Sequence, residues 1–127
     1  MNEVKTMPST LADVLKREWD RDYCRETVTL AAGDALALGS VLGKVTADGK
    51  YKLSPATGAT GEEVACAVLM EAVTEFVSDR EILILARGPV IVSDAAIVYD
   101  ASVDDAAKKT AKHAELAAFG IVVRHGV

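Results

Sequence analysis

Glycine, Asp-Gly and proline recur at close spacing through residues 25–87 and divide this stretch into short apolar runs. Short apolar runs between turn-forming residues are typical of strands joined by tight turns, so the stretch predicts a compact β domain. Half of the 127 residues are apolar but only 5% are aromatic, so small aliphatic side chains must fill most of the core. Such a core buries less apolar area per residue, which favours a small domain that gains stability by association.

Individual strands follow from the same turn residues. Asp48-Gly49 supplies the positive φ angles that a tight hairpin needs, so residues 41–46 and 50–53 are predicted to pair as a hairpin. The apolar run 62–73 fits a buried strand, although its pattern alone also allows a helix. Further strands are predicted at residues 28–30, 82–86, 90–92 and 121–123.

One long helix is predicted in the C-terminal half, over residues 103–118. Ser102 and Asp105 have the spacing of a capping box at its start, and Gly120 is placed to end it. Six alanines within the segment favour helix and permit close packing. The predicted fold class is therefore α+β, mostly β: a small glycine-punctuated β domain with this single helix.

The first 24 residues differ from the rest, and we divide the chain into an N-terminal arm, residues 1–24, and a β-rich domain, residues 25–127. Residues 10–19 are predicted to form a short amphipathic helix, with Thr10 and Asp13 as a capping pair. One side of that helix carries an apolar stripe at helical spacing: Leu11, Val14, Leu15 and Trp19. So short a helix needs a surface to pack on. The stripe either packs on its own domain or contacts a partner, and both options stay open.

Charge and composition exclude several function classes. The net charge is −5 and the sequence has no Lys/Arg cluster, which argues against direct nucleic-acid binding. No apolar run is long enough to span a bilayer, and residues 1–10 lack the features of a secretory signal, so a cytoplasmic protein is expected. In that compartment Cys24 and Cys66 are expected to be free thiols.

No pattern of residues indicates catalysis, a cofactor or a metal. His113 and His125 are isolated, and Ser40 lies outside any nucleophile-elbow motif. The segment 58–61 lacks the ending of a phosphate loop. A loose acidic stretch lacks the ligand spacing of a calcium loop and fits helix capping and solvation: Asp94, Asp100, Asp104 and Asp105. We therefore expect a protein that is not an enzyme and needs no cofactor or metal.

A small binding or carrier module is the alternative function. Residues 32–42 faintly resemble biotinyl and lipoyl domains, which display a modified lysine at a hairpin tip. The comparable tip here is Ala47-Asp48-Gly49-Lys50, and Met70-Glu71-Ala72 has no lysine beside it.

An ordered series of segments carries a stronger resemblance. Residues 25–30 lead into Gly39-Ser40-Val41-Leu42-Gly43, and further segments follow at 52–56, 61, 64–73, 85–89, 106–109 and 120–123. Taken together, they resemble the head decoration proteins of tailed bacteriophages, the family typified by the lambda capsid-stabilising protein. The resemblance covers roughly residues 23–124, and no single motif carries it.

The resemblance implies a homotrimer on the outer surface of the expanded phage head. In that role the protein would bind the major capsid protein and stabilise the shell against the pressure of packaged DNA. Its location would be the virion, after assembly in the host cytoplasm. The family's N-terminal segment orders against the shell, so Leu11, Val14, Leu15 and Trp19 become the candidate capsid contacts. The resemblance brings no catalytic residues, and neither a membrane nor direct nucleic-acid binding is expected, for the reasons of hydropathy and charge given above.

Overall fold

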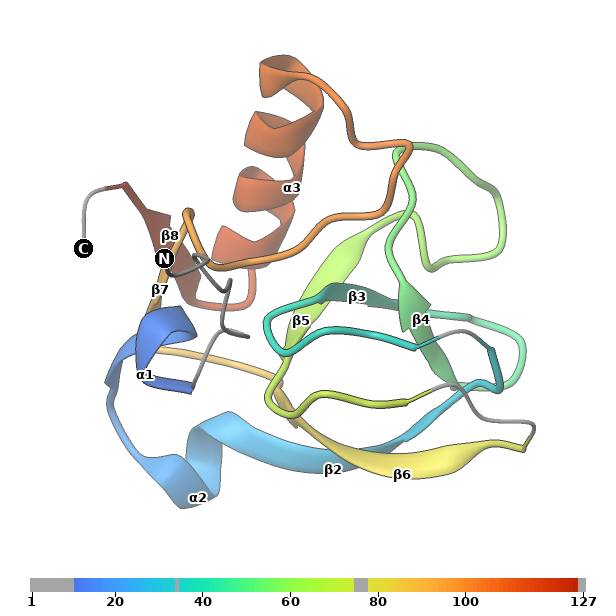
Figure 1. The fold of residues 1–127 in the computed structure, drawn as a ribbon, viewed down its shortest axis with the longest axis horizontal. Coiled ribbons are helices and arrows are strands. Elements are labelled where there is room, and N and C mark those ends of the chain that lie inside the picture. The colour runs from blue at the N-terminus through green and yellow to red at the C-terminus, as the bar shows by residue number, and fades with distance from the viewer. Residues whose placement is uncertain (1–10, 34, 75–77, 126–127) are drawn as a thin grey trace, which may run out of the picture.

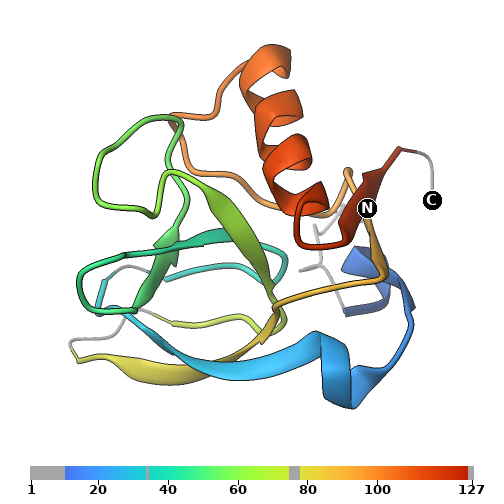
Figure 2. The same ribbon diagram turned by 180° about the vertical axis from the view of Figure 1, so that it is seen from behind.

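The computed structural model describes residues 11–33, 35–74 and 78–125. A closed five-stranded barrel lies beside a three-stranded sheet, and one long helix stands above their junction in both views (Figures 1 and 2). The barrel has the order β2-β4-β3-β5-β6 and the sheet the order β1-β7-β8. The barrel strands are β2 (Arg25–Leu30), β3 (Val41–Lys44), β4 (Tyr51–Leu53), β5 (Ala65–Leu69) and β6 (Arg80–Leu85). The sheet strands are β1 (Leu15–Glu18), β7 (Val90–Ser93) and β8 (Ile121–Arg124). The helices are α1 (Leu11–Val14), α2 (Arg21–Cys24) and α3 (Ala106–Ala117).

The prediction of a mostly β fold with one C-terminal helix is confirmed. The predicted hairpin forms between β3 and β4, with Gly49 at φ +72° in its turn. The apolar run 62–73 contains the strand β5, which pairs with both β3 and β6. The side chains of β5 are buried on both faces of the strand: Ala67 and Leu69 pack inside the barrel, and Val68 packs toward the three-stranded sheet and α3. Burial on both faces explains why the run shows no simple alternation of polar and apolar residues.

Two aliphatic clusters form the core. The first receives side chains from all five barrel strands, among them Leu30, Leu42 and Ile84. The second joins the barrel, the three-stranded sheet and α3 through residues such as Val90, Leu116 and Ile121. The sheet and the helix are therefore held against the barrel by apolar burial, which is the main favourable term in folding.

The helix α3 begins later than predicted. Asp105 is its N-cap, and the Asp105 side chain accepts a hydrogen bond from the Lys108 amide at 2.8 Å. Ser102 is not the cap: its hydroxyl accepts from the Ala56 amide at 2.9 Å and donates to Asp100. Gly120 follows the helix at φ +82°, a conformation that favours glycine, and leads directly into β8.

The predicted helix over residues 10–19 is wrong within the described residues. Only α1 is helical, and the chain then becomes the strand β1, which pairs antiparallel with β7. A ten-residue helix is marginal in water, whereas pairing with β7 satisfies the same backbone groups and covers an edge of the sheet. Thr10 of the predicted capping pair, and the side chain of Asp13, lie outside what the structure describes.

A buried lysine connects α3 to the barrel, and the sequence pattern does not reveal it. Lys112 is only 2% exposed. Its ammonium donates to Ser54 Oγ at 3.0 Å and to the Glu63 carbonyl oxygen, and it lies 3.3 Å from Glu115 Oε1. The Glu115 carboxylate also accepts from the Ala65 amide at the start of β5, at 2.8 Å. Charge and hydrogen bonds thus compensate the burial of the ammonium.

A second polar contact of α3 predicts a pH dependence of stability. The Tyr99 hydroxyl lies 2.5 Å from His113 Nε2, and burial lowers the pKa of His113 below 6.5. The unfolded chain therefore binds more protons below pH 6.5, so this contribution to stability is lost as pH falls below that value. Between pH 7.5 and pH 5.5, the free energy of unfolding measured in urea should fall less in His113→Gln than in the unmodified protein. Equal losses in both proteins would contradict this role of His113.

Candidate functional site

The structure separates the four predicted contact residues. Val14 is 1% exposed and lies in the core cluster that joins sheet, barrel and α3, so its side chain is not exposed on the surface of this fold. Leu11 and Leu15 are half-buried and pack against the same cluster. Trp19 is 66% exposed, directly after β1. Most of the apolar stripe therefore packs in or against the protein's own core, and Trp19 alone of the four is mostly exposed.

Trp19 belongs to a cluster of exposed aromatic and charged side chains that the sequence analysis missed. Its ring packs edge-to-face on Tyr23 of α2, with ring centroids 5.5 Å apart. The Arg87 guanidinium lies 5.4 Å from the centroid of the Tyr23 ring and donates to the Tyr23 carbonyl oxygen at 2.6 Å. Arg87 is also paired with Glu26 at 3.1 Å. The helix α2 is short, but Asp20 caps it by accepting from the Asp22 amide, which fixes where Tyr23 lies.

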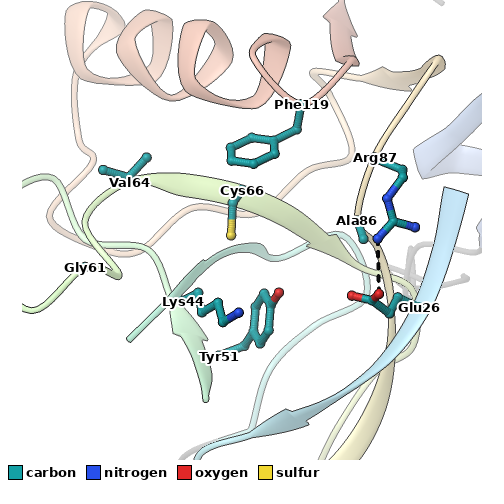
Figure 3. A pocket seen from close by; sticks show the side chains of 9 residues that line it. All are labelled: Glu26, Lys44, Tyr51, Gly61, Val64, Cys66, Ala86, Arg87 and Phe119. Carbon is teal, nitrogen blue, oxygen red and sulfur yellow. Dashed lines mark hydrogen bonds and ion pairs between the residues drawn. The ribbon is translucent and has the colours of Figure 1, made fainter. Parts of the chain in front are cut away.

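A shallow pocket of about 440 Å³ opens beside this cluster. Figure 3 shows Lys44 and Tyr51 side by side on one wall, Cys66 pointing toward them, Phe119 on the opposite wall and the Glu26–Arg87 pair at one end. Phe119 is 43% exposed and reaches the pocket from the turn between α3 and β8. The pocket therefore brings together residues from four barrel strands, from the segment after β6 and from the end of α3.

The pocket lacks an activated nucleophile. Burial raises the pKa of the Cys66 thiol, partly offset by the nearby Lys44 ammonium, so the thiol stays protonated at neutral pH and reacts slowly. Burial likewise raises the pKa of Tyr51. Both cysteines are free thiols, as predicted, and Cys24 is fully buried. The arrangement suits contact with another surface more than covalent chemistry.

Other candidates from the sequence have local structural roles. Lys50, at the hairpin tip that a carrier module would modify, is paired with Asp79, whose hydrogen bond raises the pKa of the lysine. Asp104 pairs with Lys108 at 2.8 Å across one turn of α3. Within residues 11–33, 35–74 and 78–125, no group of three potential ligands could hold a metal ion. The same residues contain no helix long and apolar enough to cross a membrane.

The amino-acid sequence offers only weak signals for the exposed aromatic residues of this surface. The chain contains only six aromatic residues, one Trp, three Tyr and two Phe. Of the five that the structure describes, three are more than 40% exposed: Trp19, Tyr23 and Phe119. Trp19 and Tyr23 have acidic neighbours in sequence, and Phe119 precedes a glycine. Aromatic residues beside acidic ones are therefore a sequence signal for Trp19 and Tyr23, whereas Phe119 lies in the apolar stretch 116–123 and has no such signal.

Comparison with known proteins identifies the family. No curated protein matches the chain. The family model for bacteriophage lambda head decoration protein D matches residues 4–121, which include α1, β1, the whole barrel and α3. The match extends beyond the β-rich domain into the first 24 residues, to which the sequence resemblance hardly extended. The chain therefore belongs to the bacteriophage lambda head decoration protein D family, a family of structural capsid proteins of the phage head surface rather than enzymes.

Proposed function

We propose that the protein binds the outside of the expanded phage head as a homotrimer and stabilises the shell against the pressure of packaged DNA. The observation that carries this proposal is the family match over residues 4–121. Each trimer would contact several subunits of the major capsid protein and hold them together.

Two physical arguments support this form of action. A protein that binds the expanded lattice and not the unexpanded one stabilises the expanded state by mass action. A trimer presents three contact surfaces at once, so individually weak contacts combine into tight binding. The core is built mainly of aliphatic side chains, whereas the large aromatic side chains of Trp19, Tyr23 and Phe119 are exposed. Exposed apolar side chains of this size mark a surface that contacts other molecules.

We further propose that residues 1–24 contribute to the capsid contact, with Trp19 as the principal exposed side chain. We do not propose that residues 10–19 dock as one amphipathic helix in a groove of the capsid, because residues 15–18 form β1 and Val14 is buried. Leu11 and Leu15 would contribute at the margin of the contact, where they are half-buried against the core.

Sedimentation and DNA-retention measurements test the proposal. The purified chain should sediment at three times its mass of 13.4 kDa, either free or after release from heads. Heads assembled without it should release DNA at a lower temperature than heads saturated with it. Failure of the protein to bind expanded heads, or an unchanged release temperature, would refute the proposal.

A further inference from the structure

The outer face of the three-stranded sheet carries an unusual combination of side chains. Strand register places Arg17 of β1, Ile91 of β7 and Val122 of β8 in one row across the sheet. A groove of about 450 Å³ runs over this face and is also lined by Trp19 and Arg124. The sheet lies at the opposite side of the molecule from the β3–β4 hairpin (Figures 1 and 2).

The groove is cationic although the chain as a whole carries a net charge of −5. Arg17 and Arg124 are exposed, and neither has an ion-pair partner among the described residues. Glu18 also lines the groove, but its carboxylate makes two contacts with Arg25, at 2.8 and 3.0 Å, and is largely buried. Among residues 11–33, 35–74 and 78–125, no acidic side chain pairs with either arginine at the groove.

The floor of the groove is apolar and partly open to solvent. Val122 is 38% exposed, Ile91 is half-buried and the exposed Trp19 also lines the groove. The solvent face of an antiparallel or mixed sheet normally carries polar side chains. An apolar floor between two exposed arginines complements a segment that has both carboxylates and an aliphatic side chain.

Strand geometry also sets how far apart the carboxylates of such a bound segment must lie. Arg17 and Arg124 stand on the two outer strands, and two strand spacings of about 4.8 Å plus the offset along β8 separate them by roughly 10–12 Å. An extended segment advances about 3.3 Å per residue, so carboxylates about three or four residues apart reach both arginines.

We propose that this face, the Arg17–Arg124 groove, binds an extended acidic segment of a capsid subunit, with an aliphatic side chain of that segment seated on Ile91 and Val122. The inference rests on the proposed function, since it names the chemistry of the partner that the decoration protein recognises. The contact uses the face of the sheet, so it does not require a strand to be added at an edge.

Charge reversal in the full chain tests the groove. Arg17→Glu combined with Arg124→Glu should weaken binding to expanded heads at least about tenfold, measured by co-sedimentation in 50 mM NaCl. Binding of the unmodified protein should weaken with added salt, and that of the variant should respond less. Trp19 is the only tryptophan, so its emission should shift to shorter wavelength when the unmodified protein binds heads.

A matched control carries the same change in net charge on the barrel. Lys52 of β4 and Arg80 of β6 are exposed and have no ion pair among the described residues. Lys52→Glu with Arg80→Glu should leave head binding within about threefold of the unmodified protein. Arg17→Lys with Arg124→Lys keeps both charges and should retain most of the binding. Circular dichroism should show that all variants unfold at similar temperatures.

Each contrary outcome identifies a different error. Equal head binding by the Arg17/Arg124 variant and the unmodified protein overturns the groove and leaves the proposed function standing. Equal loss in the Lys52/Arg80 control means that net charge, not the groove, governs binding. Loss of self-association in the Arg17/Arg124 variant means that a second copy of this chain occupies the groove. If deletion of residues 1–10 shifts the Trp19 emission in the absence of heads, residues 1–10 of the same chain occupy the groove. Failure of the unmodified protein to bind heads removes both proposals.

Discussion

Replacing Gly88 by alanine is expected to lower the free energy of unfolding by about 3 kcal/mol or more. A Cβ atom on Gly88 would lie 1.8 Å from the carbonyl oxygen of Gly120, a distance at which backbone must move. The Gly88 amide donates to the Phe119 carbonyl oxygen at 2.8 Å, and the Val90 amide donates to Gly120 at 3.2 Å. The substitution would therefore separate two backbone segments that hold the start of β7 against the turn before β8.

Urea unfolding of Gly88→Ala, followed by circular dichroism, measures this effect. Gly33→Ala is the matched control, because nothing lies within 4 Å of the Cβ position of Gly33 and its φ is not in the left-handed region. The control should change the free energy of unfolding by less than about 1 kcal/mol. Equal effects of the two substitutions would show that the close approach of Gly88 to Gly120 does not limit stability.

Replacing Lys112 by alanine is expected to cost about 3–5 kcal/mol of unfolding free energy. The ammonium is buried, and its removal would leave Ser54 Oγ and the Glu63 carbonyl oxygen without this donor and the Glu115 carboxylate without its cation. Burying polar acceptors that have lost their partner is costly, in addition to the loss of packed methylene groups. The loop between β4 and β5 should loosen first, because Lys112 contacts it at both Ser54 and Glu63.

A lysine one turn away provides the control for Lys112. Lys108 pairs with Asp104 in an exposed ion pair on the same helix, so Lys108→Ala should change stability by no more than about 1 kcal/mol. Hydrogen exchange of the β4–β5 loop should increase in Lys112→Ala and stay unchanged in Lys108→Ala. If Lys112→Ala unfolds at the same urea concentration as the unmodified protein, the buried contacts of this lysine are not stabilising.

Local signals in the sequence predicted most of the secondary structure. The turn at Asp48-Gly49 predicts the β3–β4 hairpin, Gly88-Pro89 marks the break between β6 and β7, and Gly120 marks the end of α3. These features depend on φ preferences and on missing backbone donors, which act within a few residues. The capping-box spacing of Ser102 and Asp105 predicted a cap at the start of α3, although Asp105 and not Ser102 occupies the cap position.

The first 24 residues show where local reasoning fails. The spacing of Leu11, Val14, Leu15 and Trp19 fits a helix, yet residues 15–18 pair with β7, far away in sequence. Helix periodicity reports which side chains share a face only if the backbone is helical, and a marginal helix yields to strand pairing. The same strand pairing sends Val14 into the core and leaves Trp19 exposed.

The sequence by itself determined the mostly β class, the positions of most strands and of α3, and the resemblance to phage head decoration proteins, because these depend on local turn chemistry and on the order of segments. Only the tertiary structure shows that the parallel contact of β2 and β4 helps to close the barrel, that Lys112 is buried between α3 and the β4–β5 loop, and that Arg17, Ile91 and Val122 align on one face. Each of these joins residues distant in the chain, and their proximity arises from burial of apolar surface and pairing of backbone hydrogen bonds across the whole domain.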